Sequence, residues 1–131
     1  MVPAISHDDF VLVLLRYQDP SVEADNVESA ELLALLNAAL AALREAPGFV
    51  RGWVGRSPDD LSQWVLASSW ADVGSMRRGM GSFAAKMTLG PLQSFANEAS
   101  GAFEVLTTAE KSEESHYASG LSPDAHTAHP E

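Results

Sequence analysis

A largely apolar segment near the N-terminus, residues 10–17 (FVLVLLRY), whose one charged residue is Arg16, constrains the fold of this 131-residue chain more than any other feature. The segment has the length of a β-strand, and it lacks the alternation of apolar and polar residues that marks a strand with one side in water. The sequence therefore predicts a central strand that is covered on both faces. No apolar run approaches the roughly 20 residues that a membrane-spanning helix needs, so a membrane protein is not expected.

Two helices are expected from the spacing of large apolar residues. The first covers residues 28–46, with Ser29 as its N-cap. Its apolar face repeats every three or four residues, at Leu33, Leu36, Leu40 and Leu43. The second helix begins after Asp72, another candidate N-cap, and its apolar stripe comprises Met76, Met80, Phe83 and Met87. Pro91 predicts a short third helix after it.

Three further strands complete the predicted domain. Residues 49–56 and 63–70 flank a Ser-Pro-Asp-Asp turn and predict an antiparallel hairpin, and residues 102–106 predict the last strand. By the two-residue period of a strand, one face of the first hairpin strand carries Phe49, Arg51, Trp53 and Gly55. The order β–α–β–β–α–β predicts an α+β ferredoxin-like domain with an antiparallel four-stranded sheet. Such a sheet has helices on one face only, so its second apolar face predicts a homodimer through the sheet faces.

The charge of the chain bears on its domain organisation and its partners. With 18 acidic and 8 basic residues the formal net charge is −10, and neither nucleic acid nor anionic lipid is an expected partner. Five of the acidic residues lie in the polar segment 108–131, which we predict to be a disordered acidic tail. Residues 1–8 are predicted to be a flexible N-terminus and residues 9–107 a single folded domain. The absence of cysteine and of a basic, apolar leader predicts a cytoplasmic protein without disulfides.

Several segments within residues 10–107 occur in a familiar order. They are FVLVLLRY, a Leu/Ala-rich helix, Pro47-Gly48-Phe49 at the start of the second strand, WVLASSW at the end of the third, and DVGSMRR at the start of the next helix. This succession resembles the antibiotic biosynthesis monooxygenase family of dimeric α/β barrels, in particular its small actinobacterial members. The resemblance implies a cavity in each subunit between the sheet and the second-helix region. Some members use it to oxygenate anthrones or quinols without a cofactor.

The resemblance also implies roles for individual residues. Trp70 matches a tryptophan that lines the cavity in similar monooxygenases, and Arg16 or Tyr17 would hold and polarise a phenolate or carbonyl of the substrate. The catalytic candidates are therefore Trp70, Tyr17 and Arg16. The candidates for substrate binding are Trp53, Ser68, Met76, Met80, Phe83 and Met87.

Each candidate also has a purely structural explanation. A tryptophan on a strand is more often part of a core or an interface, and a methionine stripe is more often the buried face of a helix. Arg16 and Tyr17 could simply end the strand in solvent, or Arg16 could form an ion pair with Glu104 or Asp72.

Three functions are compatible with the sequence. The first is a cofactor-independent monooxygenase, without metal, that acts on a small aromatic such as an anthrone or quinol. The alternative is a non-catalytic ligand-binding or accessory protein of a biosynthetic pathway, because Tyr17, Arg16 and Glu104 are the only evident internal acids or bases. Haem binding is disfavoured, since Met80 stands where haem-degrading relatives have a histidine. No metal site is expected at His126-x-x-His129, which lacks further ligands nearby.

Overall fold

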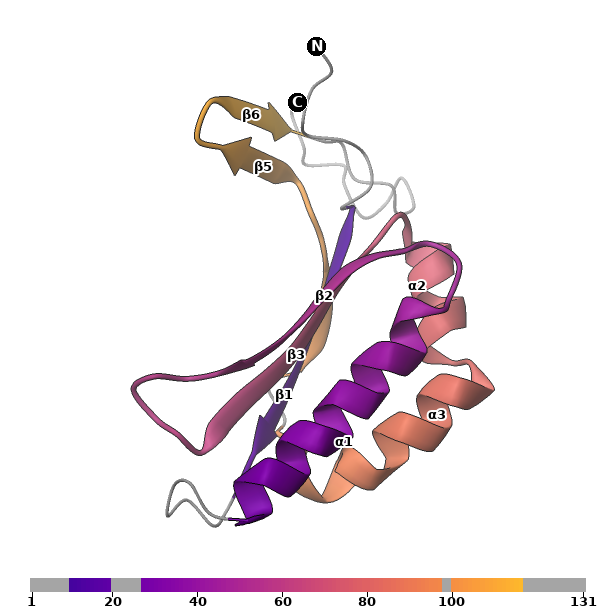
Figure 1. Ribbon diagram of the computed structural model, residues 1–131. Helices are drawn as coiled ribbons and strands as arrows, with labels where there is room; N and C mark the ends of the chain where they lie inside the picture. Colours follow the sequence, from indigo (N-terminus) through magenta and orange to yellow (C-terminus); the bar gives the residue numbers. More distant parts are fainter. Residues whose placement is uncertain (1–9, 20–26, 98–99, 117–131) are drawn as a thin grey trace.

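The computed structural model describes residues 10–19, 27–97 and 100–116, and it shows a sheet with helices on one face and a separate hairpin (Figure 1). The elements in chain order are β1 (Val11–Gln18), α1 (Val27–Arg44), β2 (Phe49–Arg56), β3 (Gln63–Trp70), α2 (Val73–Met80), α3 (Phe83–Leu89), the 3₁₀ helix η2 (Gly90–Phe95), β4 (Gly101–Glu104), β5 (Thr107–Glu110) and β6 (Glu113–His116).

The main sheet has four antiparallel strands in the order β2-β3-β1-β4. This topology confirms the predicted ferredoxin-like α+β fold, and β1 is a central strand as its apolar sequence predicts. Val11 and Tyr17 of β1 are buried on the helix side, opposite Trp70 and Trp64 of β3. No helix in the described part of the chain is long and apolar enough to cross a membrane.

The helix α1 packs on the sheet through a stripe that differs in part from the predicted one. The residues of this stripe that are fully buried are Leu32, Leu36, Ala39 and Leu43, with spacings of four, three and four. Leu33 lies beside the stripe and is exposed, so its assignment to the core was wrong. The helix begins at Val27, which places Ser29 inside the first turn and excludes it as the N-cap.

A β-bulge alters the predicted faces of β2. The pairing with β3 shifts between Phe49 and Arg51, so the side chains before and after the bulge no longer alternate regularly. Phe49 packs against the core, whereas Arg51 and Trp53 are exposed. The prediction that Phe49 shares a face with Arg51 and Trp53 was therefore wrong. The preceding turn needs Gly48, whose φ of +90° is unfavourable for other residues.

The predicted second helix is two helices. Asp72 caps α2 as expected, α2 ends at Met80, and Ser82 caps α3. The interruption rotates the second half of the apolar stripe away from the interior. Phe83 is 78% exposed and Met87 59% exposed, while Met76 and Met80 pack against the core. A continuous buried stripe was therefore a wrong prediction.

The segment after β4 is partly ordered, contrary to expectation. Residues 107–116, of which 108–116 belong to the predicted disordered tail, form the antiparallel β5–β6 hairpin. Backbone pairing in this segment comes from Thr-rich and Glu-rich strands with a two-residue turn, a pattern that composition alone does not distinguish from disorder. The rest of the tail and the predicted flexible N-terminus, residues 1–8, lie outside the described residues.

The face of the sheet opposite the helices is apolar at its centre. Because side chains alternate along a strand, the residues of β1 and β3 that do not point toward the helices point to this side. Trp53 pairs with Ala67 of β3, and its side chain is 45% exposed. Phe103 pairs with Leu12 of β1, and its side chain is 53% exposed. We call this surface the open face; its apolar residues are Leu12, Leu14, Trp53, Val65 and Phe103.

Candidate functional site

Trp70 is a core residue. Its side chain is 0% exposed, and its ring meets that of Phe49 edge-on at 5.5 Å between centroids. The indole Nε1 donates a hydrogen bond of 2.9 Å to Ser68 Oγ. The indole also packs on Gly79, where a Cβ would overlap it. Trp70 and Ser68 are therefore brought together, but inside the core.

Tyr17 and Arg16 lie at the far end of β1 from Trp70. Tyr17 is buried, and the loss of hydration raises the pKa of its phenol, so it stays protonated at neutral pH. Arg16 is exposed and points to the open face, so the two neighbours face opposite sides of the sheet. Glu104 pairs with Val11, five residues and about 17 Å along the strand from Arg16, which excludes the suggested ion pair between them.

The other candidates are spread over three surfaces. Met76 and Met80 are half-buried against the core, and Phe83 and Met87 are exposed on α3. Trp53 lies on the open face, with the Arg51 guanidinium 6.0 Å from its ring centroid. The predicted site residues thus do not surround one common cavity in the described structure.

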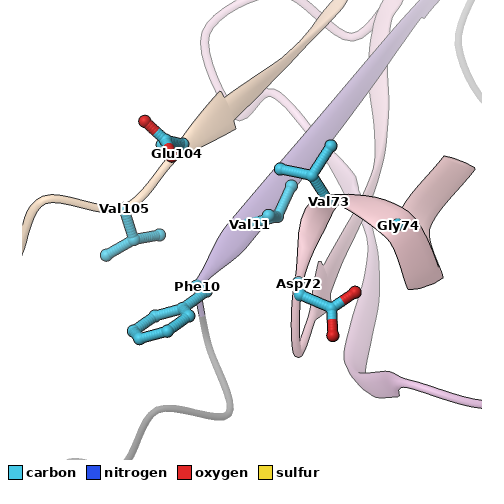
Figure 2. Close-up of a pocket in the computed structure, with 7 residues that line it drawn as sticks. All are labelled: Phe10, Val11, Asp72, Val73, Gly74, Glu104 and Val105. Atoms are coloured by element: carbon cyan, nitrogen blue, oxygen red, sulfur yellow. The ribbon is translucent and has the colours of Figure 1, made fainter. Parts of the chain in front are cut away.

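A cavity of about 260 Å³ lies beside α2, at the end of the sheet where β1 begins and β4 ends. Figure 2 shows Phe10 and Val105 on one side of it and Val73 on the other. A hydrogen bond of 2.7 Å from Val105 N to Phe10 O holds the ends of the two strands together. The residues that line the cavity are Phe10, Val11, Asp72, Val73, Gly74, Glu104 and Val105.

Two carboxylates belong to this otherwise apolar lining. Asp72 Oδ1 accepts a hydrogen bond of 2.7 Å from Ser75 N as the N-cap of α2. The backbone and side-chain hydrogen bonds from Ser75 lower the pKa of Asp72, which makes it a poor proton acceptor. Glu104 ends β4 and is half-buried. It is the second carboxylate of the cavity lining.

Other hollows lie elsewhere on the described structure, and two of them are similar to this cavity in size. One, of about 380 Å³, lies between α1 and β2 beside Asn37, Arg44 and Gly52, and is more open. The other, of about 270 Å³, lies at the far end of the sheet beside Arg16 and Gln63. Neither has a carboxylate in its lining, so the cavity next to α2 is the better candidate for a ligand that gives up a proton.

The sequence contains the signal for this cavity, but only indirectly. In the predicted topology β1 and β4 are antiparallel neighbours, so Phe10 at the start of one must lie near Val105 at the end of the other. The loop that ends β3 brings Asp72 to the same edge. The pairing of β1 with β4 identifies these residues, whereas a search for aromatic residues and methionines does not.

Because Asp72 caps α2 through its carboxylate, we expect the stability of the folded chain to depend on this residue in a pH-dependent way. Because the pKa of Asp72 in the folded chain lies below its ordinary value of 3.8, its stabilising contribution is present above about pH 3.8 and is lost as pH falls through the folded value. Asp72→Asn keeps a capping side chain but no longer titrates. We expect the wild type to have the higher urea midpoint at pH 5 and the difference to shrink towards pH 2. A difference that is constant with pH would contradict this explanation.

The fold is similar to that of several solved structures. SnoaB from Streptomyces nogalater, a cofactor-independent oxygenase, has 23% sequence identity and a TM-score of 0.60 over 79% of this chain and 95% of its own. Rv0793 from Mycobacterium tuberculosis has 18% identity and a TM-score of 0.58 over 77% of this chain and 97% of its own. A proposed antibiotic biosynthesis monooxygenase from Deinococcus radiodurans has 16% identity and a TM-score of 0.62 over 76% and 96%.

These likenesses confirm the resemblance in fold to antibiotic biosynthesis monooxygenases. The similar structures come from varied organisms, so they give no support to a specifically actinobacterial group. No family model matches the sequence. No curated protein matches it either.

Proposed function

We propose that this protein is a cofactor-independent monooxygenase that binds a small phenolic substrate in the cavity between β1, β4 and α2. The observation that carries the proposal is the lining of that cavity, which combines apolar walls from Phe10, Val73 and Val105 with the Glu104 carboxylate. The likeness in fold to SnoaB, an oxygenase that works without a cofactor, adds support. Such a reaction depends on a substrate that can itself reduce oxygen.

The proposed chemistry needs few groups from the protein. Glu104 accepts the proton of the phenol, and the phenolate then transfers one electron to O₂, which gives a substrate radical and superoxide. Their combination forms a C–O bond at a ring carbon that carries hydrogen, and the resulting peroxide anion takes the proton back from Glu104. Loss of water from the resulting hydroperoxide leaves one oxygen atom in a new carbonyl group. The apolar walls exclude bulk water from these intermediates.

The size of the cavity narrows the substrate class. Its volume of about 260 Å³ is just below the range of roughly 300–1,000 Å³ that is typical of small-molecule sites. We therefore favour a phenol or quinol of one or two rings over a three-ring anthrone. The Asp72 carboxylate at the rim disfavours an anionic substituent, because a like charge would face it.

We also propose that the protein is a homodimer, with the open faces of two chains in contact. Trp53 and Phe103 expose large apolar side chains there, next to Leu12, Leu14 and Val65. Contiguous apolar surface of this kind marks interaction sites. A second copy would cover the second side of β1, as the sequence of that strand predicts. A cytoplasmic location stays a prediction from the sequence.

A second candidate is a protein that binds the same small aromatic without converting it. It is favoured by the burial of Trp70 and Tyr17, because neither of them lines the cavity, whose described titratable side chains are the carboxylates of Asp72 and Glu104. This candidate predicts saturable binding of phenols and no consumption of oxygen.

Oxygen uptake distinguishes the two candidates. Purified protein, with no metal or flavin added, is assayed with a panel of phenols, hydroquinones and anthrones in an oxygen electrode. We expect uptake above the buffer rate with at least one compound of one or two rings, together with one new carbonyl oxygen derived from O₂. Binding without uptake across the panel would reject the oxygenase and favour the binding protein.

A further inference from the structure

The outer face of α3 exposes two large apolar side chains next to each other. Phe83 is 78% exposed and Met87 is 59% exposed, and they stand one helical turn apart, at positions i and i+4. The cap of the helix fixes this direction: Ser82 Oγ accepts a hydrogen bond of 3.1 Å from Ala85 N, and Ala85 is fully buried. Because Ala85 lies on nearly the opposite side of the helix from Phe83, the phenylalanine faces outwards.

Positive charge surrounds this apolar pair. Lys86 follows Phe83 by three positions and therefore lies on the same face of α3. Arg77 and Arg78 lie in the last turn of α2, which ends shortly before α3 begins, and all three cations are exposed. Residues 73–95 contain these three cations and no acidic residue, in a chain with a formal net charge of −10. We call this surface the basic patch; its residues are Arg77, Arg78, Phe83, Lys86 and Met87.

The basic patch extends to the cavity beside α2. The Arg78 guanidinium folds back along the helix to Gly74, where an added Cβ would lie 3.3 Å from Arg78 Nη1. Gly74 is part of the cavity lining. A partner seated on the basic patch would therefore stand next to the cavity.

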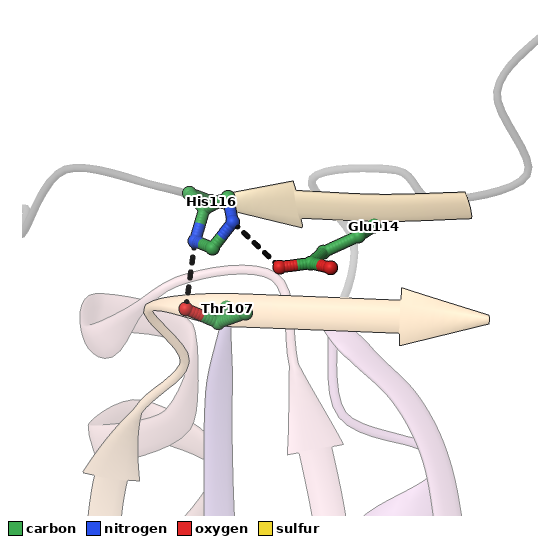
Figure 3. Close-up of polar contacts among 3 residues, drawn as sticks. All are labelled: Thr107, Glu114 and His116. Atoms are coloured by element: carbon green, nitrogen blue, oxygen red, sulfur yellow. Dashed lines mark hydrogen bonds and ion pairs between the residues drawn. The ribbon is translucent and has the colours of Figure 1, made fainter.

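The acidic hairpin of the chain lies on another side of the molecule. The strands β5 and β6 project from the end of β4, on the side of the sheet away from the helices (Figure 1). Glu114 already contacts His116 there, with 2.8 Å between Oε2 and Nε2, and Thr107 Oγ1 lies 2.9 Å from Nδ1 of the same ring (Figure 3). Within the described part of the chain, this hairpin therefore does not cover the basic patch.

The charge of the patch distinguishes among possible partners. A second copy placed there by two-fold symmetry would bring the same cations face to face. Clusters that bind anionic membranes carry about four to eight Lys or Arg residues, whereas this patch carries three. An acidic protein segment fits better, because its carboxylates would pair with the cations and its apolar side chains would cover Phe83 and Met87.

We infer that the basic patch docks an acidic amphipathic helix of another protein. Phe83 and Met87 form a ridge along α3, and a helix with apolar residues at the same spacing packs on such a ridge. Its carboxylates bind Lys86 and Arg78 at the border of the contact. The acidic residues elsewhere on this chain oppose the contact only weakly at physiological salt, because charges more than about 8 Å apart are largely screened.

Two labelled peptides of about 18 residues, long enough to form a helix, test the inference on the full-length protein by fluorescence anisotropy. Both carry leucine at every third or fourth position. The remaining positions hold alanine and glutamate in the acidic peptide, and alanine and lysine in the basic peptide. We expect the acidic peptide to bind with a Kd of about 10–100 μM and the basic peptide to bind at least about tenfold more weakly.

Two variants and two matched controls place the contact. Phe83→Ala and Lys86→Glu should each weaken binding of the acidic peptide about tenfold, and both residues are exposed, so the fold should persist by circular dichroism. Phe103→Ala removes an exposed ring from the open face, and Lys111→Glu reverses an exposed charge between β5 and β6. Both controls should leave the Kd within about twofold of wild type.

The assay needs no substrate, so its result is independent of the proposed oxygenase reaction. Weakening by both Phe83→Ala and Lys86→Glu, with no effect of the controls, would establish the docking surface. No binding of the acidic peptide up to about 1 mM, equal binding of the two peptides, or a Kd that either variant leaves intact would overturn the inference. Binding to vesicles of equal parts phosphatidylcholine and phosphatidylserine, lost in Phe83→Ala and without binding of the acidic peptide, would overturn it in favour of a lipid surface.

Discussion

Trp70→Ala is expected to lower the free energy of unfolding by about 3–5 kcal/mol, the range for removing a large aromatic side chain from a core. The side chain is fully buried, stacks edge-on with Phe49, and fills the space above Gly79. Its removal leaves a cavity and also deprives Ser68 Oγ of its hydrogen-bond donor. The loss is measured as a lower urea midpoint by circular dichroism.

Phe83→Ala is the matched control for this substitution. It also removes an aromatic ring, but Phe83 is largely exposed on α3, so the expected change is within about 0.5 kcal/mol. A cost below about 1 kcal/mol for Trp70→Ala would mean that Trp70 does not support the core. The function that the resemblance implied for it, as a wall of the substrate cavity, would then become the better explanation.

Glu104→Gln is expected to reduce the rate of oxygen consumption about 100-fold, at the lower end of the effect of a positioned general base. The amide is nearly the same size as the carboxylate, so the cavity keeps its shape, but an amide does not accept a proton from a phenol at neutral pH. The substrate should still bind, so the loss should fall on kcat and leave KM within a few-fold.

Glu45→Gln removes the same charge from an exposed position in the turn between α1 and β2, and it should leave the rate unchanged. Equal losses in Glu104→Gln and Glu45→Gln would trace the effect to overall charge. An unchanged rate in Glu104→Gln would show that another group, or the solvent, takes the proton.

The fold could be predicted largely because it follows from local patterns. The apolar β1 segment, the hairpin of β2 and β3 and the cap at Asp72 each determine an element without reference to the rest of the chain. The wrong predictions concern side chains whose direction is set by tertiary contacts rather than by the local sequence. A bulge moved Phe49 to the helix side, and the break at Gly81 turned Phe83 outwards.

The candidate site was harder to predict than the fold. Large aromatic and sulfur-containing residues such as Trp70 and Met80 attracted a functional interpretation, but the same size that makes them suitable cavity walls also makes them effective core residues. The cavity is lined instead by valines and carboxylates at the ends of strands. Val105 and Glu104 acquire a role only from the pairing of β4 with β1, which depends on contacts more than 90 residues apart in sequence.

The central claim is that oxygen chemistry takes place in the cavity between β1, β4 and α2, and filling that cavity tests it most directly. Oxygen consumption is measured side by side for the wild type, Val105→Phe and Leu106→Phe. Val105 lines the cavity and the partly exposed Leu106 next to it does not, so the two variants add the same ring in different places. The account predicts that uptake is lost in Val105→Phe and kept in Leu106→Phe. Full uptake by a folded Val105→Phe protein would contradict it.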